Sequence, residues 1–114
     1  MVIIRNKYVP FKGFSAMNFF GILLVRNEVE ITDTTIDHEY IHTLQMKEML
    51  YIFFYLWYII EAAIKMFNIG KKGYYRISFE QEAYLYQDDP DYKKRRKHFA
   101  WLKYVTKTQY CKGL

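Results

Sequence analysis

The chain has one cysteine, Cys111, among its 114 residues, and this scarcity excludes two kinds of architecture. A disulfide framework needs at least two cysteines in the chain. A zinc site built from cysteine thiolates needs several of them. Any metal centre in this protein is therefore expected to use histidine and carboxylate side chains.

The sequence also lacks repeats, low-complexity tracts and Ser/Gly-rich linkers. At 114 residues it has room for one hydrophobic core, and an apolar fraction of 52% is enough to fill that core. We therefore expect a single domain over residues 1–114. The first residues, MVIIRNK, lack the basic-then-apolar layout of a signal peptide, so the expected location is cytoplasmic.

Aromatic residues and positive charge are abundant. Aromatics make up 20% of the chain, and the net charge of +5 favours anionic partners such as acidic lipid head groups or nucleic acid. Residues 93–97 are all basic, but consecutive residues spread around a helix, and no nucleic-acid-binding motif accompanies them. We interpret the run as a solvated helix face, with Phe99, Trp101, Leu102 and Val105 packing inward, and expect no nucleic-acid partner.

The order of patterns along the chain predicts an α+β fold. Residues 1–33 contain strand candidates at 2–5, 19–25 and 29–31, with a turn at 26–28. From about Thr35 to Met66 the pattern is helical, with Asp33 or Thr34 as a cap. After a break at 70–73, helices are predicted over 78–87, with Ser78 as the cap, and over 92–105. The fold is thus an N-terminal β-hairpin followed by a long helical stretch and further helices.

Residues 49–60 are twelve apolar residues without a charge. Crossing a bilayer takes roughly twenty, so this run is short for a membrane span. We interpret it as a buried helix at the centre of the small core. The alternative is a membrane-associated protein in which the run dips into a bilayer, with Trp57 and its tyrosines at interface depth and residues 93–97 against an anionic membrane surface.

The run His38-Glu39-Tyr40-Ile41-His42 carries the strongest chemical signal. Two histidines four apart on a helix project from one face, as two ligands of one Zn²⁺ require. Glu39 follows the first histidine and is placed to act as the general base that activates water at the metal. The run therefore predicts a zinc-binding and catalytic motif.

Such a site needs a third protein ligand, and the candidates are His98 and the acids of the helix at 78–87. Here the chain resembles gluzincin-type zinc metallopeptidases, including the prenyl-protein protease and heat-shock membrane protease branch, in which a downstream helix bears Glu-x-x-Ala-Asp. The matching run, EQEAY over 80–84, implies that Glu80 is the third ligand, with Glu82 as the alternative. An exposed Glu80–Arg76 ion pair is the structural alternative for Glu80. The HExxHxxQ run also resembles small bacterial zincin-like domains of unassigned function.

The sequence departs from the gluzincin pattern at Tyr84, which stands where those peptidases usually carry Asp. Support for a ligand histidine must then come from elsewhere. Gln45 is a candidate for that support, since it lies three residues after His42 on the same helix face. A hydrogen-bond donor to a transition-state oxyanion is also needed, and Tyr84, Tyr74, Tyr75 and His98 are chemically suitable.

The leading prediction is a minimal zincin-like α+β domain that hydrolyses peptide bonds, with an active-site helix after the hairpin and about three further helices. His38, His42 and Glu80 would bind Zn²⁺, and Glu39 would activate water. A strand over 21–26 would pair with the peptide or protein substrate. The alternative is a non-catalytic zinc-binding or membrane-associated interaction module, whose site a fourth protein ligand would close.

Overall fold

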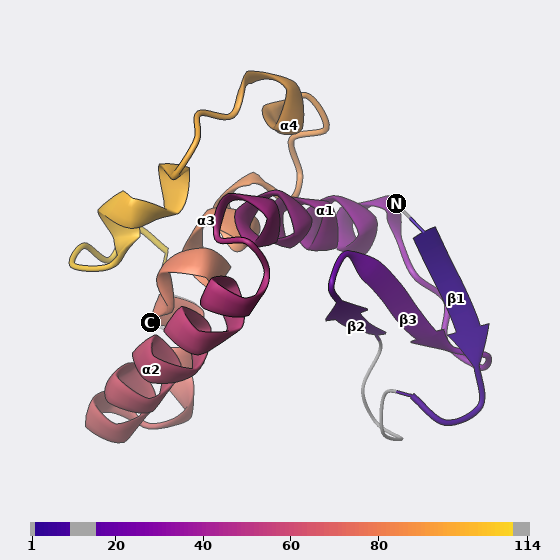
Figure 1. The fold of residues 1–114 in the computed structure, drawn as a ribbon, viewed down its shortest axis with the longest axis horizontal. Coiled ribbons are helices and arrows are strands. Elements are labelled where there is room, and N and C mark those ends of the chain that lie inside the picture. The colour runs from indigo at the N-terminus through magenta and orange to yellow at the C-terminus, as the bar shows by residue number, and fades with distance from the viewer. Residues whose placement is uncertain (1, 10–15, 111–114) are drawn as a thin grey trace.

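The computed structural model describes residues 2–9 and 16–110, and it confirms the α+β fold (Figure 1). A small sheet at the N-terminus is followed by helices that carry most of the core. The elements in chain order are β1 (Val2–Asn6), β2 (Ala16–Phe19), β3 (Ile22–Arg26), α1 (Asp33–Glu48), α2 (Ile52–Ile69), the 3₁₀-helix η1 (Lys71–Arg76), α3 (Ser78–Tyr86), α4 (Tyr92–Arg95) and the 3₁₀-helix η2 (Ala100–Tyr104).

The three strands form one sheet in the order β1-β3-β2, so β3 is the central strand. It runs parallel to β1 and antiparallel to β2. The β2–β3 turn is formed by Phe20 and Gly21, with φ of 52° and 91°, the positive values that a two-residue hairpin turn of the commonest type requires. The predicted strand over 19–25 is wrong in placement because it runs through this turn, and residues 29–31 form no strand.

Leu23 and Val25, the fully buried residues of the sheet, share one face with Ala16 and Asn18 of β2, the strand that contacts α1. β2 is fixed to α1 by Asn18, whose side-chain amide donates to the Glu39 carbonyl oxygen at 2.9 Å and to the Thr43 hydroxyl at 3.1 Å. α1 begins after Thr32, whose hydroxyl accepts from the Thr35 amide at 3.2 Å. The helix cap is therefore Thr32 rather than the Asp33 or Thr34 that the sequence suggested.

The helical stretch from 35 to 66 consists of two helices, the predicted active-site helix α1 and the apolar helix α2. Leu50 and Tyr51 adopt φ of 53° and 59°, which ends α1 and turns the chain into α2. Left-handed conformations at non-glycine residues cost roughly 1–2 kcal/mol each. The Tyr51 amide donates to the Met46 carbonyl oxygen at 2.8 Å and helps to hold the turn.

The interpretation of residues 49–60 as the buried centre of the core is wrong. In α2 only Phe54 and Glu61 are buried, and most of the large apolar side chains of the helix face solvent. The other elements of this small chain cover only one side of α2. The core lies on that side, where Met46, Phe54, Ile77, Phe79 and Trp101 pack together.

Glu61 joins α2 to the start of α3. Its carboxylate accepts hydrogen bonds from the Ser78 amide and the Ser78 hydroxyl, both at 2.6 Å, and pairs with Lys65 at 2.6 Å. The free backbone amides at a helix N-terminus favour a negative group there. Ser78 is thus the first residue of α3 rather than its cap, and Glu61 takes over the capping role from another helix.

The predicted helix over 92–105 is also wrong, because the chain becomes extended at Arg96 and continues into η2. The Arg96 guanidinium lies between Glu48 of α1 and Glu82 of α3, with Nη2 2.9 Å and 3.0 Å from their carboxylates, and its side chain is only 4% exposed. One member of the basic run is therefore buried. Trp101 is buried as expected, whereas Phe99 and Leu102 are exposed.

Arg96→Ala is expected to lower the free energy of unfolding by about 3–5 kcal/mol, because it leaves Glu48 and Glu82 buried without their counter-charge. Urea denaturation followed by circular dichroism measures this change. Arg95→Ala is the matched control, since Arg95 pairs with Asp89 at the surface, and it should change stability little. Equal losses in the two variants would show that the buried pair has no special role.

Candidate metal centre

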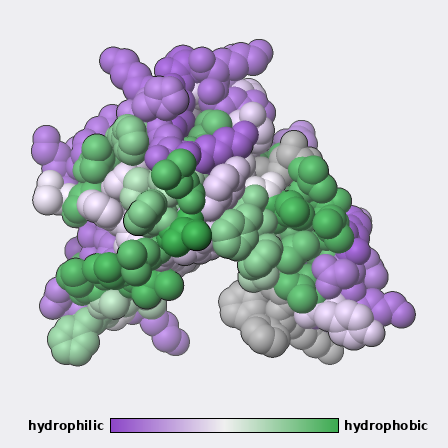
Figure 2. All heavy atoms as spheres, in the orientation of Figure 1, coloured by the Kyte–Doolittle hydropathy of each residue, from purple (hydrophilic) through white to green (hydrophobic). Residues whose placement is uncertain are grey.

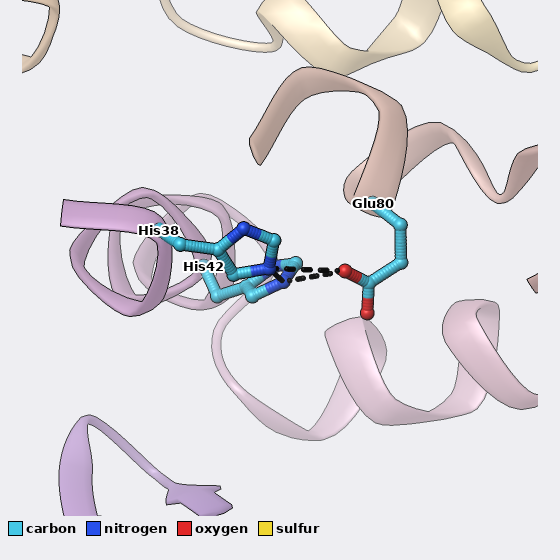
Figure 3. A group of neighbouring side chains, drawn as sticks. All are labelled: His38, His42 and Glu80. Atoms are coloured by element: carbon cyan, nitrogen blue, oxygen red, sulfur yellow. Dashed lines mark hydrogen bonds and ion pairs between the residues drawn. The ribbon is translucent and has the colours of Figure 1, made fainter. Parts of the chain in front are cut away.

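The two histidines of the motif lie one turn apart on α1 and face α3 (Figure 3). Their Nε2 atoms are 3.2 Å apart, and both side chains are buried. Glu80, in the first turn of α3, completes the group. Its Oε1 atom lies 3.2 Å from His38 Nε2 and 3.0 Å from His42 Nε2, and the residue is 3% exposed.

Glutamine side chains fix the orientation of both imidazole rings. His38 Nδ1 lies 2.9 Å from Gln87 Oε1, and His42 Nδ1 lies 2.8 Å from Gln45 Oε1. The Gln45 amide nitrogen donates to the Phe79 carbonyl oxygen and to Glu82, so its oxygen must face His42. His42 Nδ1 is therefore protonated and donates, so Nε2, which faces Glu80, is the ring nitrogen that can bind a metal ion or a second proton.

These three ligand atoms form a triangle that matches a tetrahedral metal site. Zinc–nitrogen bonds of about 2.0–2.1 Å place neighbouring ligands about 3.3 Å apart, and the observed separations are 3.0–3.2 Å. Within residues 2–9 and 16–110, His38, His42 and Glu80 are the one group of side chains arranged to hold a metal ion. The donor set fits a metal ion with three protein ligands.

The charges of the His38, His42 and Glu80 group also favour binding of a cation. Burial opposes a charge on His42, but the Glu80 carboxylate outweighs it and raises the pKa of His42 to about 9. Burial likewise works against the Glu80 charge, yet the two histidines hold the pKa of Glu80 well below its usual range. An ionised carboxylate buried among imidazoles thus attracts either protons or a metal ion.

Tyr58 of α2 determines which oxygen of Glu80 is available. Its hydroxyl donates to Glu80 Oε2 at 2.6 Å, while Oε1 faces the histidines. Burial and the nearby Glu80 charge raise the pKa of Tyr58, so the phenol stays protonated and keeps donating. Glu80 is thereby oriented to offer a single oxygen to a metal.

A pocket of about 310 Å³ opens beside His42 and Glu80. Glu39 lines it, in keeping with the role predicted for that residue. The other walls come from β2, α1, α2 and η1: Ala16, Met17, Asn18, Met46, Phe54, Tyr55, Tyr58 and Tyr74. Two of the three candidate ligands, the motif residue Glu39 and an edge strand therefore meet at one cavity.

Two alternative third ligands lie elsewhere. Glu82 is buried, but its carboxylate is engaged by Arg96, Gln45 and Tyr92. The His98 side chain is 91% exposed and pairs with Glu48 at 3.1 Å. The alternative prediction for Glu80, an exposed ion pair with Arg76, is also wrong, because the Glu80 carboxylate faces the histidines in the interior.

Of the other residues predicted for the site, some contact the histidines and some line the pocket. Gln45 contacts His42, as its spacing suggested. The Tyr84 ring packs edge-on against His38, with ring centroids 4.5 Å apart, and it is not among the residues that line the pocket. Tyr74 does line it. As a donor toward the pocket, Tyr74 is better placed than Tyr84.

Sequence reasoning missed three features of the site. Tyr58 was hidden in the apolar run, where a tyrosine resembles one more hydrophobic residue. Gln87 lies seven residues, or two helical turns, after Glu80, and that spacing is the one signal that could have revealed it. The strand over 21–26 is wrong as the substrate-pairing edge, because β3 is paired on both sides and β2 is the edge strand at the pocket.

Compared with known proteins, the chain matches no family model, no curated protein and no solved structure. The resemblance to gluzincins therefore depends on the two sequence motifs.

Gln45→Ala should weaken Zn²⁺ binding about 10- to 100-fold, because His42 loses the acceptor that fixes its ring and its tautomer. Competition with a chromophoric chelator measures the affinity. Gln81→Ala is the matched control, since Gln81 is a fully buried glutamine that holds the backbone of residues 76, 104 and 107 and contacts neither histidine. Unchanged affinity in folded Gln45→Ala, or equal losses in both variants, would contradict the assigned role.

Proposed function

We propose that this protein is a zinc-dependent metallopeptidase of gluzincin type. The observation that carries the proposal is the convergence of His38, His42 and Glu80 beside a pocket that His42, Glu80 and Glu39 line. Two imidazole nitrogens and one carboxylate oxygen form a ligand set used by catalytic zinc sites, which leave a fourth position for water or substrate. Hard, oxygen-preferring cations such as Mg²⁺ suit this nitrogen-rich set less well.

A bound Zn²⁺ would supply Lewis acidity to a peptide carbonyl and lower the pKa of water. Glu39 would take the proton of the attacking water on its carboxylate and return it to the leaving amine. Tyr74 is a candidate donor to the oxyanion. Burial and the Glu80 charge raise its pKa, so its hydroxyl keeps the proton that it would donate.

A peptide substrate would pair with the edge of β2. Along the edge strand of an antiparallel ladder, the backbone groups of every second residue point away from the partner strand. The Asn18 carbonyl points away from β3 in this way, because it accepts a hydrogen bond from the Tyr55 hydroxyl. Tyr55 also accepts from the Phe20 amide and so occupies the end of the edge nearest the turn. Ala16, two residues before Asn18, has the same outward orientation and lies at the pocket, which supports substrate pairing there.

The alternative is a non-catalytic module in which zinc only stabilises the fold. A closed structural site has four protein ligands, whereas the group found in the described part of the chain has three. The pocket beside this group also favours an open catalytic site. We therefore prefer the enzymatic proposal.

Glu39→Gln should keep its zinc and lose hydrolysis of a peptide library by about 10²–10⁴-fold, because glutamine preserves the size of the side chain but cannot accept the proton. Zinc content by elemental analysis and cleavage by mass spectrometry give the two readouts. Glu30→Gln, the same change at an exposed residue before α1, is the matched control and should keep both. Full activity in Glu39→Gln, or no cleavage by the zinc-loaded wild type, would contradict the proposal.

A further inference from the structure

α2 has an unusually large uncovered apolar surface for an element of a small protein. Of its 18 residues only Phe54 and Glu61 are buried. Figure 2 shows this surface as a continuous hydrophobic band along the helix. Its most exposed large residues, from 52% to 91% exposed, are Ile52, Phe53, Leu56, Ile59, Ile60, Ile64 and Phe67.

The charges of α2 are directed into the protein. Glu61 and Lys65 are its only ionisable residues apart from two tyrosines, and they pair with each other at 2.6 Å. Glu61 also binds Ser78 of α3, and Lys65 donates to the carbonyl oxygens of residues 76 and 104. The outer surface of α2 therefore presents no charge along its whole length.

The sheet carries a second uncovered apolar surface. Because side chains alternate along a strand, Leu23 and Val25 face α1, and Ile22 and Leu24 face the other side. The register places four further apolar side chains, all exposed, on that outer face: Val2, Ile4, Met17 and Phe19. Figure 2 shows two hydrophobic regions, over α2 and over the sheet, with a notch between them.

Exposed lysines stand at both ends of the α2 surface. Lys47 lies just before the turn into α2, and Lys71 follows the glycine that ends it. Both lie next to an uncharged apolar surface in a chain of net charge +5. This arrangement complements the anionic head groups that border the hydrocarbon of a membrane.

The extent of the α2 surface favours a bilayer over a protein partner. A protein groove contacts one stripe of a helix, and a protein interface usually has a polar rim. Here the exposed apolar residues cover about half of the helix circumference, a wider face than the stripe that one groove contacts, and lipid can cover such a face. At 1.5 Å per residue α2 is about 27 Å long, and a helix with one broad apolar face can lie along a bilayer with that face inserted below the head groups.

We propose that the protein docks on a lipid bilayer with anionic head groups, inserting the outer surface of α2 and resting the outer face of the sheet on the same membrane. The pocket of the metal centre is lined by residues of both α2 and β2, so docking would place that pocket beside the bilayer. This inference does not depend on the proposed peptidase activity.

Flotation of the full chain with phosphatidylcholine–phosphatidylglycerol vesicles tests the proposal. The wild type should float with the vesicles, and brominated lipid should quench its tryptophan emission, because Trp57 is 39% exposed on the α2 surface. Trp57→Phe supplies the emission of Trp101 alone. Ile64→Glu, a change at an exposed position, should leave the fold intact and reduce vesicle binding at least about tenfold.

Leu85→Glu is the matched control, because it places the same charge at an exposed leucine of α3, away from the α2 surface, and it should bind vesicles as the wild type does. Weaker binding to pure phosphatidylcholine vesicles would support the role of the lysines. The proposal would be overturned if the wild type failed to float, or if Ile64→Glu and Leu85→Glu lost vesicle binding equally. It would also be overturned if the protein formed a lipid-free dimer that Ile64→Glu dissociates. Zinc content, measured in parallel, reports on the metal centre independently of these outcomes.

Discussion

Three lone pairs that converge on one buried point are the constraint on which the rest of this structure depends. His38 and His42 come from α1 and Glu80 comes from α3, so their meeting fixes the packing of the two helices at the centre of the molecule. A buried carboxylate without a counter-charge is strongly unfavourable, so Glu80 needs either a protonated His42 or a metal ion beside it. A metal ion at this point would convert a costly polar cluster into a cross-link between α1 and α3.

Hydrogen bonds extend this constraint outward from the metal centre. His42 bonds Gln45, Gln45 bonds Glu82, and Glu82 pairs with Arg96, which also reaches Glu48. This series of hydrogen bonds connects the candidate metal ligand His42 to the segment after α4. The pairing of Arg96 explains why that segment leaves the helical conformation. The backbone is extended at Arg96, where the guanidinium lies between the two carboxylates. Such a connected network holds the rings of the site in one orientation.

The sequence predicted the grouping of His38, His42 and Glu80 better than the boundaries of the helices and strands. The histidine spacing is local and survives any error in the helix ends, and Glu80 was inferred from a second motif rather than from geometry. The turn at Phe20 and Gly21 was missed because phenylalanine is rare at positive φ. The prediction of a helix over 92–105 was wrong because the tertiary pairing of Arg96 overrode the local helical pattern. The prediction that residues 49–60 are buried was wrong because composition alone does not show which side of a helix is covered. Long-range contacts decide these features, and a single sequence does not display them.

The central claim, that His38, His42 and Glu80 bind one zinc ion, is tested most directly by crystallography at the zinc absorption edge. The protein should be purified without added metal, and an anomalous difference map calculated from data on the high-energy side of the edge. The account predicts one peak, absent below the edge, about 2.0–2.2 Å from His38 Nε2, His42 Nε2 and Glu80 Oε1, with the fourth position toward the pocket lined by Glu39. A peak bound by other residues, or none even after soaking with Zn²⁺, would contradict it.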